Sequence, residues 1–122
     1  MTNDNAENLK DRTKRFAIET IRFCASLPKT QELRIVGGQL MRSASSVGAN
    51  YRAACRARSV ADFVAKLSIV EEEADESVYW MEILSGLGAD EDAELTRLKS
   101  EADQLVAIVV ASKKTARRRN EE

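Results

Sequence analysis

Residues 63–84, FVAKLSIVEEEADESVYWMEIL, decide the fold. Apolar or small side chains recur in this stretch at intervals of four and three residues, at Phe63, Leu67, Val70, Ala74, Ser77, Met81 and Leu84. This heptad spacing puts them on one side of an α-helix, which has to pack against other helices. Just before the stretch, Ser59 and Asp62 have the spacing of a capping box, so we expect this helix to cover residues 59–86.

Three more stretches carry apolar side chains at helical spacing: residues 6–26, 30–57 and 90–116. Pro28 ends the first of them, because the residue before a proline is pushed out of the α-helical region. Thr30 can cap the second, since its hydroxyl can accept a hydrogen bond from a free backbone amide. After the 59–86 helix, Gly86 and Gly88 can supply a left-handed stop, and Asp90 starts the last helix.

The composition favours helices over other structures. Of the 122 residues, 43% are apolar and 32% are charged, with five glycines and one proline. Such a chain is too hydrophobic for disorder and too poor in turn-forming residues for an all-β domain. Four helices joined by short connections must fold back on one another to bury their apolar faces. We therefore predict an all-α fold, an antiparallel up-down-up-down four-helix bundle, as a single domain over residues 1–122.

The middle of the second predicted helix carries little side-chain bulk. Residues 43–49 read SASSVGA, so a neighbouring helix can approach closely there. Gly37 and Gly38 lie earlier in the same stretch, and each costs roughly 1 kcal/mol relative to alanine in a helix interior. Two interpretations follow: a helix that continues through both glycines, or one that is kinked there or begins only near Gln39.

Polar residues beside this small-residue patch predict a structural network. Arg42, Ser43 and Asn50 lie on the second helix, and Glu73 and Glu76 lie on the third. Because an unpaired buried charge is costly, we expect Arg42 to contact Glu76 or Glu73, with Asn50 as a further hydrogen-bonding partner. Such a network specifies how the helices fit together rather than adding net stability. It contains no nucleophile paired with a base, so we predict no catalytic residues and no enzyme.

The absence of histidine argues against a transition-metal site. Histidine is the commonest transition-metal ligand, and a di-iron centre in a helix bundle needs a Glu-x-x-His motif on two helices. We therefore expect neither a metal nor a cofactor. Cys24 and Cys55 lie on different predicted helices without a Cys-x-x-Cys spacing, so we expect two buried, reduced thiols.

The net charge of −1 hides a segmented distribution. Residues 30–58 hold five basic residues and one acidic residue, whereas residues 59–94 hold one basic and eleven acidic residues. The first residues, MTNDNAENLKDR, contain no apolar leader, and no stretch approaches the roughly 18 apolar residues of a membrane span. We expect a cytoplasmic protein with no membrane partner.

The basic tail, residues 113–122, is the densest positive run and contains Lys113, Lys114, Arg117, Arg118 and Arg119. Two interpretations are open: the dipole of a helix C-terminus favours cations, and the same cations can contact phosphates. The candidate nucleic-acid surface extends to the second predicted helix and the turn after it, with Arg34, Arg52, Arg56 and Arg58. No RNA-reading motif is interleaved with aromatic residues, so we interpret the aromatic side chains as packing residues.

Three stretches resemble a known family. Residues 39–50 (QLMRSASSVGAN), 58–69 (RSVADFVAKLSI) and 76–83 (ESVYWMEI) are similar to the pattern of a bacterial four-helix-bundle family first found encoded in intervening sequences of 23S ribosomal RNA genes. The matching positions are Arg42, Ser43, Asn50, Arg58, Phe63 and Glu76. Gly48 stands where the family often has proline, so we expect a straighter second helix, and the basic tail has no family counterpart. The resemblance implies a bundle that assembles into a homopentameric ring and has no established enzymatic activity.

A more distant similarity in bundle pattern connects the chain to accessory proteins of retroelements, which bind nucleic acid and a polymerase. The leading hypothesis is a non-catalytic homo-oligomer that binds RNA, or a nucleic-acid-processing protein, through its basic surfaces. The alternative is a protein–protein interaction scaffold or accessory subunit without a nucleic-acid role, in which Trp80 and Ile83 belong to an assembly face.

Overall fold

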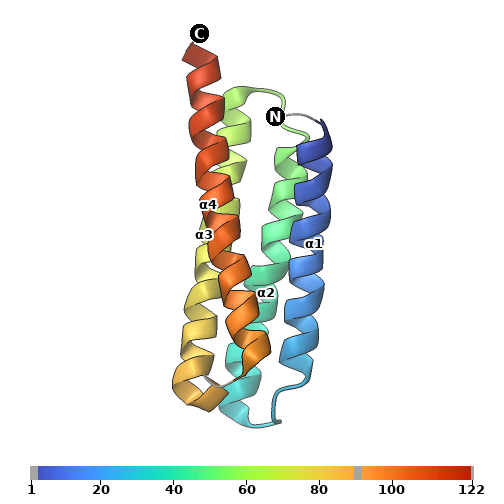
Figure 1. The fold of residues 1–122 in the computed structure, drawn as a ribbon, viewed down its shortest axis with the longest axis vertical. Coiled ribbons are helices and arrows are strands. Elements are labelled where there is room, and N and C mark those ends of the chain that lie inside the picture. The colour runs from blue at the N-terminus through green and yellow to red at the C-terminus, as the bar shows by residue number, and fades with distance from the viewer. Residues whose placement is uncertain (1–2, 90–91, 122) are drawn as a thin grey trace.

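Within the part of the chain that the structure describes, the protein consists of four long helices and one short helical turn. The computed structural model describes residues 3–89 and 92–121. The elements are α1 (Asn3–Ala25), α2 (Gln31–Ala54), α3 (Val60–Leu84), η1 (Ser85–Ala89) and α4 (Ala93–Glu121). Successive long helices lie side by side and run in opposite directions (Figure 1), which confirms the predicted all-α, up-down-up-down four-helix bundle.

The predicted caps set the starts of α2 and α3. The Thr30 hydroxyl accepts a hydrogen bond from the Leu33 amide at 3.3 Å, and the Ser59 hydroxyl accepts one from the Asp62 amide at 3.0 Å. These side chains satisfy backbone donors that a helix N-terminus leaves free. The Asp62 carboxylate also accepts a hydrogen bond from Lys66, which lowers the pKa of Asp62.

The link between α3 and α4 differs in part from the prediction. Gly88 has a φ of 109°, the left-handed backbone expected of a helix stop, whereas Gly86 does not have a positive φ. The predicted start at Asp90 lies outside the described residues. Instead, the Asp92 carboxylate accepts hydrogen bonds from the Glu94 amide at 2.8 Å and from the Leu95 amide at 3.3 Å, so α4 begins at Ala93.

The glycine pair does not interrupt α2. The helix begins at Gln31 and continues to Ala54, so the alternative of a kink or a start near Gln39 is wrong. Gly37 is buried against α1, where an added Cβ would lie 3.6 Å from the Leu27 side chain and 3.8 Å from Cys24. These are ordinary van der Waals distances, so alanine would also fit at position 37. The helix continues because burial of the apolar face of α2 outweighs the poor helix propensity of glycine.

The heptad residues of α3 form the centre of the core. Those with 0% exposure are Leu67, Val70, Ala74, Ser77, Met81 and Leu84. Each buried leucine contributes about 1.5–3 kcal/mol relative to an exposed one, so this seam holds α2, α3 and α4 together. Phe63, the first heptad position, is only half-buried, because it lies where the bundle opens near the α2–α3 turn.

The two ends of the bundle are formed by different segments of the chain (Figure 1). The α2–α3 turn, the start of α1 and the finish of α4 share one end, and α4 reaches past the turn (Figure 1). α4 extends to Glu121, beyond the predicted end at residue 116. α1 packs mainly against α2, and its contact with α4 is the sparsest among the neighbouring helices. None of the described helices has the length and apolar composition needed to cross a bilayer.

Candidate nucleic-acid interface

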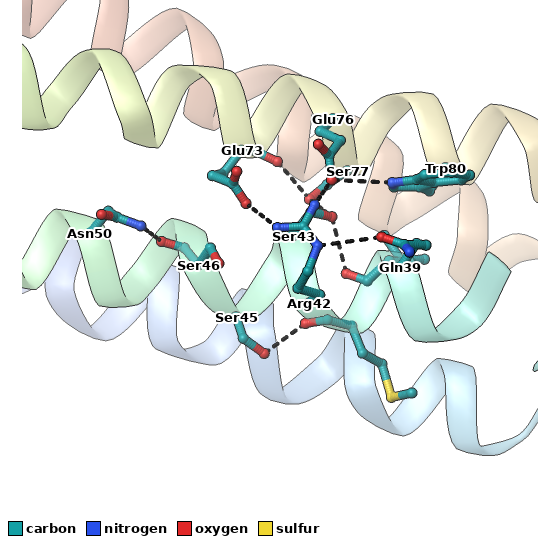
Figure 2. Close-up of polar contacts among 12 residues, drawn as sticks. Gln39, Arg42, Ser43, Ser45, Ser46, Asn50, Glu73, Glu76, Ser77 and Trp80 are labelled. Carbon is teal, nitrogen blue, oxygen red and sulfur yellow. Dashed lines mark hydrogen bonds and ion pairs between the residues drawn. The ribbon is translucent and has the colours of Figure 1, made fainter. Parts of the chain in front are cut away.

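Arg42 on α2 binds two carboxylates on α3. Its guanidinium lies 3.1 Å from Glu73 Oε2 and also forms an ion pair with Glu76 (Figure 2). Glu76 accepts a second hydrogen bond, from the Trp80 indole N–H at 3.2 Å. On the other side, Arg42 Nε donates to the Gln39 side chain at 3.4 Å. The structure thus brings Arg42 on α2 together with Glu73 and Glu76, which lie one turn apart on the facing helix α3.

This ion-pair group lies at the surface rather than in the core. The Arg42 side chain is 48% exposed and that of Glu76 is 37% exposed, while Glu73 is 18% exposed. The predicted contact of Arg42 with Glu73 or Glu76 is confirmed. The reason given for it, burial of the charges, is wrong, because the guanidinium is exposed. Exposed ion pairs of this kind contribute about 0–1 kcal/mol.

The buried layer of the α2–α3 seam consists of small hydroxyl side chains. Ser43 and Ser77 are both 0% exposed, and their Oγ atoms lie 2.9 Å apart. Each hydroxyl has one proton, so one serine donates to the other, and the acceptor of that bond donates within its own helix, either Ser77 to the Glu73 carbonyl or Ser43 to the Leu40 carbonyl. Both hydroxyls are satisfied, and their small volume lets α2 and α3 approach closely.

Asn50 does not join this group. Its amide nitrogen donates to the Ser46 carbonyl one turn back, at 2.8 Å, and it lies away from the carboxylates (Figure 2). The prediction that Asn50 is a partner of the Arg42 group is therefore wrong. Asn50 is two turns along α2 from Arg42, too far for its short side chain, so the local backbone acceptor satisfies it.

The seam between α1 and α4 is bridged by arginines that the sequence analysis did not select. Arg12 on α1 donates to both oxygens of Glu101 on α4, each at 2.7 Å, and to Gln104 at 2.9 Å. The hydrogen bond to Glu101 raises the pKa of Arg12, so this guanidinium stays charged. Arg97 on α4 pairs with Glu94 on its own helix and, at 3.4 Å, with Glu19 on α1.

Lys113 is not an exposed cation. Its ammonium lies 2.7 Å from Glu71 and donates to the Ser68 hydroxyl at 3.2 Å, and the side chain is only 14% exposed. Because the Glu71 carboxylate and the Ser68 hydroxyl of α3 occupy it, Lys113 is not available for phosphates in this structure. The prediction that Lys113 contacts nucleic acid, as part of the basic tail, is therefore corrected: in the structure it pairs with Glu71 instead.

Seven other predicted cations lie together at one end of the bundle. They are exposed, and none has a side-chain ion-pair partner among the described residues: Arg52, Arg56, Arg58, Lys114, Arg117, Arg118 and Arg119. The first three come from the end of α2 and the turn to α3, and the other four come from the end of α4. These elements meet at the same end (Figure 1), and we call this group the basic end. Arg34 lies at the opposite end, near the start of α2.

The cysteines offer little nucleophilic chemistry. Cys24 is 8% exposed, and burial raises the pKa of its thiol to about 11, so it stays protonated at neutral pH. Cys55 is a free thiol and only half-buried, so the expectation of two buried thiols holds for Cys24 alone. Within residues 3–89 and 92–121, no three Cys, Asp or Glu side chains converge as ligands for a metal ion.

The chain matches the 23S rRNA-intervening sequence protein family over residues 8–111. It belongs to that family. The chain is also similar to a crystal structure from Bacteroides thetaiotaomicron, described as a protein with unknown function from the S23 ribosomal protein family. The two are 28% identical over 89% of this chain and 97% of the other, with a TM-score of 0.81. No curated protein matches significantly.

The family match covers the bundle but not the free tail cations. Arg42, Glu73 and Glu76 lie inside the matched residues, whereas Lys114 and the three arginines after it lie beyond residue 111. Neither match names a retroelement accessory protein, so that similarity stays a prediction.

The sequence does not predict the bridge between Arg12 and Glu101, because a pair so far apart in sequence leaves no local pattern to detect.

Proposed function

We propose that this protein is a non-catalytic, oligomeric bundle that binds RNA, or the RNA of a ribonucleoprotein, through its basic end. The observation that carries the proposal is the concentration of seven exposed cations, without ion-pair partners among the described residues, where α2 and α4 finish. Arginine and lysine at such a surface neutralise phosphates and release counterions from the nucleic acid.

The distribution of acidic residues supports the same end. The carboxylates of α3 lie mostly in its middle, and three of them are already paired across helices, Glu73 and Glu76 with Arg42 and Glu71 with Lys113. Intrachain pairing thus leaves the cations of the basic end as the main charged feature available to an anionic partner. Exposed charges more than about 8–10 Å apart are largely screened at physiological salt, so the acidic middle of α3 does not cancel this field.

A non-catalytic role is favoured because the chain has no histidine and burial keeps the Cys24 thiol protonated. These two facts remove the commonest general base and one of the two cysteine nucleophiles.

Self-association is supported by apolar side chains left on the surface. Ile35 is 58% exposed and Tyr79 is 54% exposed, and Ile18, Ile21 and Ile69 are each at least 40% exposed. They lie on α1, α2 and α3, away from the finish of α4. We propose that copies of the chain cover these side chains in a homopentameric ring. Light scattering should then give about five times the 13.6 kDa of one chain, and a mass of 13.6 kDa would contradict it.

The RNA proposal is tested by fluorescence anisotropy with a labelled, structured RNA at several salt concentrations. We expect binding at low salt that weakens as salt rises. Absence of binding at low salt would contradict the proposal.

The alternative is a protein–protein interaction scaffold, which the same exposed apolar side chains favour, Tyr79 above all. A chain that ends at Ser112 separates the two roles. If RNA is the partner, the truncation weakens RNA binding; if the protein is a scaffold, capture of its protein partner is unchanged. Retained helicity, measured by circular dichroism, controls for loss of the fold.

A further inference from the structure

The seam between α1 and α4 opens into a groove at the basic end. The groove has a volume of about 680 Å³, and its lining comes from three helices. Leu9 on α1, Phe63 on α3 and Ile108 on α4 supply much of its apolar surface. The Arg12 bridge to Glu101 holds α1 and α4 together along the same seam, and Arg12 also lines the groove. Its size lies in the range of pockets that take small organic groups.

The polar groups of this groove are hydrogen-bonding or positive. Asn8 and Thr115 contribute an amide and a hydroxyl to the lining, and Arg119 contributes a guanidinium. No carboxylate belongs to the lining that the structure describes. Arg119 has no ion-pair partner within the described residues, and it is one of the seven cations of the basic end. The groove therefore favours a ligand that combines an apolar, flat part with an anion.

We propose that this groove takes one unpaired nucleotide of the bound RNA, with the base against Phe63 and the adjoining phosphate on Arg119. This inference rests on the proposed function and names the part of the RNA that is recognised. A base stacked on an aromatic side chain, beside cations that follow the backbone, is the usual mode of single-strand binding. Asn8 and Thr115 also line the groove, so their amide and hydroxyl groups are available to hydrogen-bond the edge of the base.

A nucleotide fits these observations better than a protein helix does. A docked helix would bring its own apolar side chains, yet it would need separate acidic residues to pair with Arg119. A nucleotide supplies an aromatic ring and a phosphate as one unit. A base inside a duplex is already paired and stacked, so it cannot enter the groove without being flipped out, at a cost of a few kcal/mol. The geometry therefore predicts a preference for single strands.

The test compares two probes, a fluorescein-labelled 12-nucleotide RNA without self-complementarity and the same strand annealed to its complement. We expect the wild-type protein to bind the single strand about tenfold more tightly than the duplex. Ala111 lines the groove and is exposed, so Ala111→Leu fills the groove without removing a charge. Ala107 is exposed one turn earlier on α4 and does not line the groove, so Ala107→Leu is the matched control.

Ala111→Leu should weaken single-strand binding about tenfold and leave duplex binding unchanged, whereas Ala107→Leu should change neither. Phe63→Leu should lower only the single-strand affinity, about five- to tenfold, because stacking is lost while the apolar surface remains. Equal affinity for both probes, unaffected by Ala111→Leu, would overturn the inference and leave RNA binding by the basic end intact. If neither the single strand nor the duplex binds, the proposed function itself is overturned.

Discussion

The α2–α3 seam and the α1–α4 seam each join two antiparallel helices, but through different contacts. Across the first, Ser43 and Ser77 meet in a buried layer, and Arg42 is held by two carboxylates above it. Across the second, contact is sparse, and Arg12 provides a polar bridge to Glu101. This seam opens into an apolar groove beside the exposed cations of the basic end.

The contrast indicates that the α2–α3 seam stabilises the fold, whereas the α1–α4 seam offers a surface for binding. Small side chains close the α2–α3 seam, and its charges are paired within the chain, so little remains there for an anionic partner. The α1–α4 seam leaves apolar surface and positive charge available at the basic end. The α2–α3 seam should therefore respond to mutation mainly in stability, and the open end of the α1–α4 seam mainly in binding.

The largest effect is expected from removing the cations beside the open seam. The quadruple variant Lys114→Gln, Arg117→Gln, Arg118→Gln, Arg119→Gln should bind single-stranded RNA about 100-fold more weakly at low salt, because four phosphate contacts are lost. Its thermal midpoint should be unchanged, since these side chains are exposed and pair with none of the residues that the structure describes. The control variant Arg22→Gln, Lys29→Gln, Arg34→Gln, Lys99→Gln has the same charge change away from the basic end and should lose less than threefold. Equal losses in both would mean that net charge alone determines binding.

The next effect tests the closed seam. Ser77→Leu places a large side chain where the Ser43 hydroxyl lies 2.9 Å from that of Ser77, so we expect a loss of about 1–3 kcal/mol in unfolding free energy. Ser77→Ala keeps the small volume and should lose about 1 kcal/mol or less. Urea denaturation measures both. If Ser77→Leu is as stable as wild type, close approach of α2 and α3 is not what holds this seam.

A smaller effect is expected at the bridge of the open seam. Arg12→Met removes a two-pronged pair whose side chains are 26% and 20% exposed, leaving Glu101 without its main partner. We expect a loss of about 1–2 kcal/mol in unfolding free energy. A loss of less than 0.5 kcal/mol by urea denaturation would show that α1 and α4 do not depend on this bridge.

The smallest effect is expected for Arg42→Met. The Arg42 side chain is 48% exposed, so water replaces much of what its carboxylate partners provide, and the loss should be about 0.5 kcal/mol. Assembly and RNA binding, measured by light scattering and anisotropy, should be unchanged. A change in either would give the Arg42 group a functional role that its surface position does not require.

The sequence predicts those features of the fold that depend on local patterns. The heptad spacing of α3 identifies its core face, and the Thr30 and Ser59 caps are read from single side chains next to the helix they start. Helix propensity alone does not decide whether α2 continues through both glycines, because it does not weigh the burial of Val36 and Leu40 on the same helix. The end of α4 was placed too early, because charged helix ends lack the apolar periodicity used to find helices.

The sequence does not predict features that depend on the alignment of one helix against another. Lys113 belongs to a basic run in sequence, but the α3–α4 alignment brings it to Glu71. Asn50 fails for the opposite reason, since an available acceptor in its own helix satisfies it. The groove is formed where three helices diverge, and its lining residues are far apart in sequence, so no local pattern indicates it.

The salt dependence of RNA binding tests the central claim most directly. Anisotropy titrations of the wild-type protein with a single-stranded RNA, from about 50 to 200 mM salt, give the slope of log association constant against log salt concentration. With a phosphate contact at about −0.7 for each of the seven cations of the basic end, we expect a slope near −5, of which the four cations of α4 contribute about −3. Absence of binding at 50 mM salt, or a slope near zero, would contradict it.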